Sequence, residues 1–229
     1  MSEINKAAET EAVDNKGKKA KKKVKKTVGQ EILSWILTIL VAVVAALVIR
    51  SVIFEPVRVD GVSMDDTLAN GEIMFVSKFD YSTTWLTLPW QKIEEKEAAP
   101  RFTIGGNPNR FDVVICRYPG RGDTNFVKRV VGLPGDTIQL IDGYLYVNGE
   151  KYDEPYINDE YRSGYLNTFG PAEVPEGQYF VMGDHRNNSN DSRSVGTIDR
   201  TMIVGHVRQV VYPFGQWRAV VNGLEAKAE

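Results

Sequence analysis

The 229-residue sequence is poor in the side chains that most often build disulfides, zinc sites and catalytic triads. It has one cysteine, Cys116, and two histidines, His185 and His206. One cysteine cannot form an internal disulfide or a four-cysteine zinc site, so both kinds of scaffold are excluded. We expect neither a metal ion nor a cofactor.

The sequence also lacks a basic body. Residues 1–29 contain nine lysines and four acidic residues, a balance of +5. The rest of the chain therefore holds 19 of the 28 basic residues and 26 of the 30 acidic ones, a balance of −7. Nucleic-acid binding requires a basic face for the phosphates, so that class is excluded for the body. Few large apolar residues occur in 1–29, and we expect a disordered tail there.

Residues 32–49 form a run of 18 residues without a charge. A transmembrane helix needs about 20 mostly apolar residues, and residues 50–54 can extend this run, because the Arg50 side chain can reach the interface. A buried core helix would be shorter, and a cleaved signal peptide would have a shorter leader and a small-x-small site. We expect a retained anchor over residues 30–54. The preceding lysines predict a cytoplasmic N-terminus and a body outside.

No stretch after the anchor has helical periodicity over three turns. Asp-Gly at 142–143 and Asn-Gly at 148–149 are typical of two-residue hairpin turns. The sequence predicts a mostly β protein, with a barrel-like or sandwich-like all-β body over 55–215 and a C-terminal tail over 216–229. The expected strands are 54–60, 72–79, 112–118, 125–131, 137–141, 144–147, 178–182 and 202–212.

Two polar segments interrupt these strands, near 82–110 and 153–175, and we expect surface insertions there. The first contains an aromatic and aliphatic cluster between Trp85 and Trp90. Tryptophan is enriched at membrane interfaces, but an apolar patch can also be a lid packed on the body. Both interpretations stay open.

Lys128 lies in an apolar strand pattern. Phe126 and Val130 share its face of the strand, whereas Arg129 points to the opposite face. Burial lowers the pKa of a lysine from its usual value of about 10.4, and a neutral amine is a general base. The alternative is a lysine that reaches water at a strand edge, because lysines are rarely buried.

Ser63 lies in a turn-like stretch, residues 59–68, just after the anchor. A serine hydroxyl needs a base to become a nucleophile. Gly61 would let the backbone approach a bound peptide, and N–H groups of the turn can hold an oxyanion. The alternative is an ordinary turn serine.

A third stretch, residues 183–193, concentrates charges and hydroxyls. It is either a solvated loop or a self-contained network of ion pairs. Ser189 would be a suitable hydroxyl to hold a lysine amine. The residues expected in the network are Asp184, Arg186, Asp191 and Arg193.

Taken together and in this order, residues 61–68, 128–136 and 183–193 resemble the motifs of bacterial type I signal peptidases. The resemblance covers roughly residues 30–215, including the single anchor before the serine. It implies that Ser63 is the nucleophile, that its backbone N–H is an oxyanion donor, and that Lys128 is the general base. It also implies that Ser189 orients the lysine and that Arg129 belongs to the supporting charged network.

The resemblance further implies a location and partners. The protein would be a single-pass protein of the bacterial plasma membrane, with the catalytic domain on the outer face. Its substrates would be exported preproteins cut after small residues of the Ala-x-Ala type. Membrane lipid and the secretion translocon would be further partners, and nucleic acid would not.

The sequence departs from the family pattern at a few positions. Asp66 stands where the family usually has proline, and His185 and Asn187 stand where it usually has asparagine and aspartate. Gly61 replaces the hydroxyl side chain that serves some members as a second oxyanion donor. The second donor is therefore a backbone group or absent.

Four rival interpretations remain. A Ser-His-Asp protease would need His185 or His206, but the neighbouring Asp184 and His185 side chains would point apart. A sortase-like cysteine transpeptidase would use Cys116, although both histidines follow it in the chain. A membrane-tethered β-domain that binds a protein partner without catalysis would leave Ser63 idle. Soluble Ser-Lys autoproteases of the LexA repressor kind lack an anchor.

Overall fold

The chain divides into two compact units after residue 44, within the N-terminal helix, and the second unit contains the β-rich body. In this computed structural model, α1 spans Val28–Val52 and has the length and apolar composition of a membrane-spanning helix, and the large apolar side chains between residues 28 and 44 are exposed. It begins two residues before the expected anchor and ends two residues before its expected end. The structure describes residues 28–52, 54–85, 92, 94–95, 98–122, 124–164 and 167–221.

The body is mostly β, as the alternating sequence pattern predicts, and every strand pair is antiparallel. An eight-stranded sheet has the order β1-β2-β13-β5-β6-β11-β12, with β14 paired to β13. Its strands are β1 (Phe54–Arg58), β2 (Ile73–Ser77), β5 (Val113–Cys116), β6 (Phe126–Gly132), β11 (Gln178–Met182), β12 (Ile198–Asp199), β13 (Ile203–Tyr212) and β14 (Arg218–Ala219).

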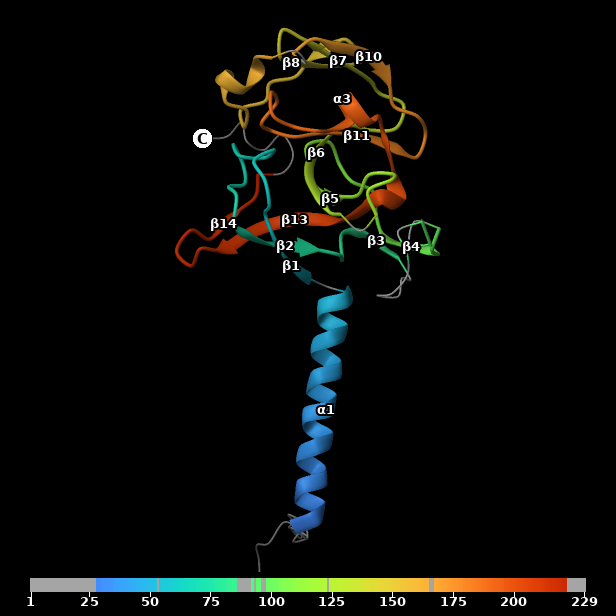
Figure 1. Ribbon diagram of the computed structural model, residues 1–229, viewed down its shortest axis with the longest axis vertical. Helices are drawn as coiled ribbons and strands as arrows, with labels where there is room; N and C mark the ends of the chain where they lie inside the picture. Colours follow the sequence, from blue (N-terminus) through green and yellow to red (C-terminus); the bar gives the residue numbers. More distant parts are fainter. Residues whose placement is uncertain are drawn as a thin grey trace, which may run out of the picture. The chain divides into compact units, whose positions relative to one another are not determined.

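Two smaller sheets complete the body. A four-stranded sheet has the order β10-β7-β8-β9, and a hairpin pairs β3 with β4. In Figure 1, β13 crosses the middle of the body, β5 and β6 curl above it, and β7, β8 and β10 lie at the top of the view. The bounds are β3 (Tyr81–Trp85), β4 (Arg101–Gly105), β7 (Thr137–Ile141), β8 (Tyr144–Val147), β9 (Glu150–Lys151) and β10 (Phe169–Glu173).

The two predicted hairpin turns have the expected backbone. Asp142 and Gly143 have φ angles of 51° and 82°, and Asn148 and Gly149 have 54° and 82°. Positive φ at both central positions defines the tight turn that matches the strand twist. Short helices complete the described body: η1 (Asp159–Arg162), α3 (Ser192–Val195) and η2 (Arg200–Met202).

Strand β6 lies where three hydrophobic clusters meet. Phe126 and Val130 pack in one cluster, Val127 packs against a second, and Val131 belongs to a third. Because side chains alternate along a strand, each face of β6 is buried against a different part of the core. A charged residue at either face of this strand is therefore removed from water.

Candidate active site

The connection between β1 and β2 presents Ser63. Gly61 has φ of +112°, which residues with a side chain rarely adopt, and a Cβ there would meet no atom within 4 Å. The backbone bend, and not crowding, therefore favours glycine. Met64 and Leu68 are buried in the core and joined by a 2.6 Å backbone hydrogen bond. This buried turn fixes the position of Ser63, which stays partly exposed.

Lys128 extends from β6 to the Ser63 side chain. Its Nζ donates a 2.6 Å hydrogen bond to Ser63 Oγ. Lys128 is only 2% exposed, on the same face as Phe126 and Val130. Burial lowers the pKa of Lys128 below its ordinary value of 10.5, because desolvation disfavours the charged amine. The arrangement can transfer the hydroxyl proton to the amine.

Ser189 lies close to the same serine. A Cβ at Gly183 would come within 2.3 Å of Ser189 Oγ and 2.4 Å of the Ser63 carbonyl oxygen, so only glycine fits between them. Ser189 Oγ is buried without a hydrogen-bond partner at normal distance and angle, and Lys128 does not bond to it. It lies near enough to Asp191 to help lower the pKa of that carboxyl. Its role toward the lysine stays a prediction.

Arg129, the next residue on β6, is fully buried and pairs with Asp184. Its Nε and Nη2 donate to the two carboxylate oxygens at 2.9 and 2.7 Å. Thr67, from the Ser63 turn, donates to Asp184 and accepts from Arg129. The pair therefore ties β6, the 183–193 stretch and the nucleophile turn together. Further partners of Arg129 are the carbonyls of Phe111 and Val221 and the ring of Tyr156.

Asp191 and Arg193 form the internal ion pair expected for the third stretch, with contacts of 2.9 and 2.8 Å. Asp191 also accepts from the Gly183 N–H at 3.1 Å. Burial alone would raise the pKa of Asp191, but the Arg193 guanidinium, together with Gly183 and Ser189, outweighs it and the pKa is lowered. The carboxylate thus stays charged and holds the loop that carries Gly183.

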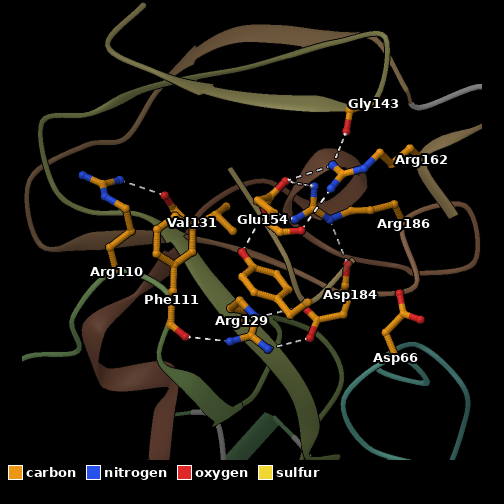
Figure 2. Close-up of polar contacts among 12 residues, drawn as sticks. Asp66, Arg110, Phe111, Arg129, Val131, Gly143, Glu154, Arg162, Asp184 and Arg186 are labelled. Carbon is orange, nitrogen blue, oxygen red and sulfur yellow. Dashed lines mark hydrogen bonds and ion pairs between the residues drawn. The ribbon is translucent and has the colours of Figure 1, made fainter. Parts of the chain in front are cut away.

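Arg186 has its ion-pair partner outside its own stretch, although its Nε donates to the Gly183 carbonyl at 3.2 Å. Its guanidinium binds both carboxylate oxygens of Glu154, which is fully buried (Figure 2). Arg162 also lies near Glu154: its Nη1 is 3.7 Å from the carboxylate, and its Nη2 donates to the Glu154 backbone carbonyl at 3.0 Å. The ion-pair partners of Asp184 and Arg186 are Arg129 and Glu154, which lie outside the stretch, whereas Asp191 and Arg193 pair within it. Sequence reasoning missed Glu154, because nothing in its polar segment distinguishes it.

The two histidines lie in different surroundings. His206 is buried, with Nδ1 3.1 Å from Asp80 and its ring stacked on Tyr81. His185 Nδ1 lies 3.1 Å from the Val62 carbonyl oxygen. Neither ring is hydrogen-bonded to the Ser63 hydroxyl, whose partner is Lys128. This geometry does not favour a histidine base.

Cys116 lies in β5 and is fully buried. Burial raises the pKa of its thiol to about 12, so the thiolate is strongly disfavoured. A buried, protonated thiol is a poor nucleophile, which argues against the cysteine mechanism. Among the described residues, no group of three or more His, Cys, Asp or Glu side chains could hold a metal ion.

The structure describes only some of the other residues to which the sequence pointed. Asp66 accepts a 2.8 Å hydrogen bond from the Asn158 N–H, so the nucleophile turn contacts the 153–175 segment. The backbone of Trp85 ends β3, but residues 86–91 lie outside the described residues, as do 1–27 and 222–229. The proposals for the aromatic cluster and for the basic tail stay predictions.

The chain is similar to known signal peptidases. The model of the family described as "Signal peptidase, peptidase S26" matches residues 32–212. Signal peptidase I of Bacillus licheniformis is 39% identical over 177 residues, covering 74% of this chain and 83% of the relative. Signal peptidase I S of Bacillus subtilis (strain 168) is 38% identical over 178 residues, with the same coverage.

A crystal structure of a signal peptidase I from Enterococcus faecalis V583 is 34% identical and covers 44% of this chain and 97% of that one, with a TM-score of 0.39. That superposition is too partial to bear on the fold. The family match spans all three motif stretches, including Ser63, Lys128 and residues 183–193. Together with the identity to the curated relatives, it shows that this chain belongs to the signal peptidase family, peptidase S26.

Proposed function

We propose that this protein is a membrane-anchored serine endopeptidase that removes signal peptides from exported preproteins, with Ser63 as nucleophile and Lys128 as general base. The observation that supports this most directly is the 2.6 Å hydrogen bond between the hydroxyl of the partly exposed Ser63 and the buried amine of Lys128. Family membership supports the reaction class, and the buried environment of Lys128 supports its role.

Each step of the reaction has a group in place. Lys128 takes the proton from Ser63 Oγ as the oxygen attacks the scissile carbonyl carbon. The Ser63 N–H donates to the oxyanion of the tetrahedral intermediate. The intermediate collapses, and the new amine leaves with the proton from Lys128. The neutral Lys128 amine then takes a proton from a water molecule, which attacks the acyl-enzyme. Lys128 returns this proton to Ser63 Oγ as the ester bond breaks, and Ser63 is regenerated.

Ser189 and the charged residues support this dyad. Gly183 brings Ser189 against the Ser63 backbone, and we assign the Ser189 hydroxyl the task of orienting the lysine amine. The pairs Arg129–Asp184 and Arg193–Asp191 keep the loop and strand that carry these groups in register. A second oxyanion donor would be a backbone N–H of the Ser63 turn, because Gly61 has no side chain to offer.

The substrate is a preprotein with small residues at positions −1 and −3, of the Ala-x-Ala type. The N-terminal apolar helix of the enzyme supports a location at the plasma membrane, where the substrates emerge. The lysine-rich tail before α1 supports a cytoplasmic N-terminus and a catalytic body on the outer face. Membrane lipid and the secretion translocon are the partners that this location implies.

The test uses the full-length protein in detergent or vesicles with a purified preprotein. Wild type should release the mature protein, cut after an alanine, and Ser63→Ala should not. Replacing the −1 alanine by phenylalanine or arginine should stop cleavage, because a shallow pocket excludes large side chains. Efficient cleavage after phenylalanine or arginine, or activity retained by Ser63→Ala, would overturn the proposal.

A further inference from the structure

The peptide group that joins Val62 to Ser63 is held by His185. The Val62 carbonyl and the Ser63 N–H belong to one planar trans unit and point in opposite directions. The Val62 oxygen lies 3.1 Å from His185 Nδ1 and accepts a second bond from the Asp65 N–H at 3.2 Å. A carbonyl oxygen can only accept, so His185 Nδ1 carries the hydrogen, in the neutral ring as well as in the charged one.

The peptide on the other side of Ser63 contacts the same residue. The His185 N–H donates to the Ser63 carbonyl oxygen at 3.2 Å. His185 therefore bonds to the carbonyls on both sides of the Ser63 Cα, once with its ring and once with its backbone. The Ser63 N–H itself has no acceptor within the described part of the chain.

The imidazole ring of His185 is also held by a stacking contact on its face. Tyr161, in η1, stacks on His185 with 3.7 Å between ring centroids and 15° between planes. Asn158 caps η1, and its N–H donates to Asp66 at 2.8 Å. The segment that carries Tyr161 is thus tied to the nucleophile turn, and the His185 ring lies between the two.

We propose that His185 is a positioning residue that aims the Ser63 N–H at the oxyanion. The inference rests on the proposed function, because it concerns the donor of that reaction. A hydrogen bond to the Val62 oxygen fixes the plane of the peptide and polarises its N–H, which strengthens the donor. Such a donor has to be oriented before the reaction begins, since reorientation in the transition state would cost free energy.

His185 does not move a proton in this scheme. Its ring hydrogen is used by the Val62 carbonyl at every protonation state of the imidazole. A variant without this hydrogen should bind substrate normally and stabilise the oxyanion less well. The expected signature is a lower kcat with an unchanged KM, and an acidic limb of the pH–rate profile that stays where Lys128 puts it.

The experiment compares His185→Asn with His185→Leu in the full-length enzyme. Asparagine places its side-chain nitrogen the same number of bonds from Cβ as Nδ1, whereas leucine has the same branching without a donor. His185→Leu should lower kcat by about tenfold, less than the 10²–10³-fold loss seen when an oxyanion donor is removed outright. His185→Asn should stay within about twofold of wild type, and His206→Asn serves as a histidine control outside the site.

A peptide aldehyde that ends in the same Ala-x-Ala sequence provides the second measurement. It adds to Ser63 Oγ and forms a tetrahedral oxyanion, so its affinity should fall with kcat in His185→Leu. The affinity of the corresponding peptide alcohol, which forms no oxyanion, should not change. Tyr161→Leu keeps the hydrogen bond but frees the ring, and should shift kcat in the same direction by a smaller factor.

Several results would overturn the inference. One is a His185→Leu enzyme with normal kcat and aldehyde affinity. Another is a His185→Asn enzyme whose kcat is as low as that of His185→Leu. A third is a loss of affinity in His185→Leu that is equal for the aldehyde and the alcohol. If His185→Leu does not fold, the asparagine and Tyr161→Leu variants still decide the matter. A wild-type enzyme that cuts no preprotein, or Ser63→Ala activity equal to wild type, would instead overturn the proposed function and this inference with it.

Discussion

The two faces of β6 carry neighbouring buried basic residues whose pKa values are shifted in opposite directions. Lys128 is 2% exposed, and its amine has one hydrogen bond, to the Ser63 hydroxyl. Arg129 is 0% exposed, but its guanidinium has two bonds to Asp184, two to backbone carbonyls and one to Thr67. Burial is the same on both faces, whereas the partners differ.

The partners therefore decide the charge. Burial lowers the pKa of Lys128, and the opposing electrostatic effects of Cys116, Asp191 and Asp184 do not reverse this shift. Burial alone would also lower the pKa of Arg129, but the charge and hydrogen bonds of Asp184 outweigh it, and the pKa is raised. A strand can thus hold a permanent structural cation and a neutral base one residue apart.

The most damaging change to the Lys128 face should be Lys128→Arg. A guanidinium stays protonated at any accessible pH and cannot accept the Ser63 proton. We expect cleavage of a preprotein to fall by at least about 10³-fold, near the background of Ser63→Ala, because loss of a catalytic base removes the nucleophile's activation. Near wild-type cleavage by Lys128→Arg, with a folded and inactive His185/His206 double variant, would favour the histidine mechanism instead.

Removing the counter-charge on the other face should affect stability above all. Asp184→Asn leaves the Arg129 charge buried without its carboxylate, and such a loss costs about 3–5 kcal/mol. Urea denaturation of the variant should show a lower free energy of unfolding. Asp159→Asn is the matched control, because its pair with Arg162 has a carboxylate 91% exposed and should contribute about 0–1 kcal/mol.

The same measurement on the Lys128 face should give the opposite sign. Lys128→Met removes an amine that is desolvated and incompletely hydrogen-bonded, so stability should rise by roughly 1–3 kcal/mol while activity is lost. If Lys128→Met and Asp184→Asn destabilise equally, the two faces do not differ in the way the contacts indicate.

The pH dependence of the cleavage rate and of the stability should distinguish Lys128 from Arg129 further. The rate should rise as Lys128 loses its proton, with an apparent pKa below the ordinary value of 10.5. Because the folded-state pKa is lowered, the unfolded chain binds more protons between the two values. Stability should therefore rise with pH in that window, by up to about 1.4 kcal/mol per pH unit, and should not depend on this group at pH values below or above it. Lys128→Met should abolish this slope, which urea denaturation at several pH values measures.

The sequence predicted one face of β6 better than the other. The position of Lys128 between Phe126 and Val130 is a local pattern with a period of two, so the face on which it lies follows from the strand itself, and the structure decides for burial over an exposed strand edge. The strands, the hairpin turns at 142–143 and 148–149, and the apolar helix are also local signals. They were confirmed for the same reason.

The partners of the other face could not be found this way. Arg129 and Asp184 are 55 residues apart, and Arg186 and Glu154 are 32 apart. Which charges meet depends on how sheets pack, and no period in the sequence records it. The β3–β4 hairpin was missed because Ser82, Thr83 and Thr84 lack the apolar alternation that marks a strand.

The smallest expected effect concerns the aromatic cover of Arg129. The guanidinium carbon lies 3.8 Å from the centre of the Tyr156 ring, and the Tyr156 hydroxyl donates to Glu154 at 2.9 Å. Tyr156→Phe should cost about 0.5–1.5 kcal/mol for the hydrogen bond, and Tyr156→Leu about 0.5–2 kcal/mol more for the cation–π contact.

A thermodynamic cycle connects this prediction to the two faces. Tyr156 contacts Arg129 and lies on its side of the strand. The changes in unfolding free energy caused by Tyr156→Leu and Lys128→Met should therefore add within about 0.5 kcal/mol. Those caused by Tyr156→Leu and Asp184→Asn should not be additive, because both residues contact Arg129. Proteolytic activity should survive Tyr156→Phe, because Asp184 still fixes Arg129. A coupling energy between Tyr156 and Lys128 as large as that between Tyr156 and Asp184 would mean that Lys128 and Arg129 are not energetically independent of each other.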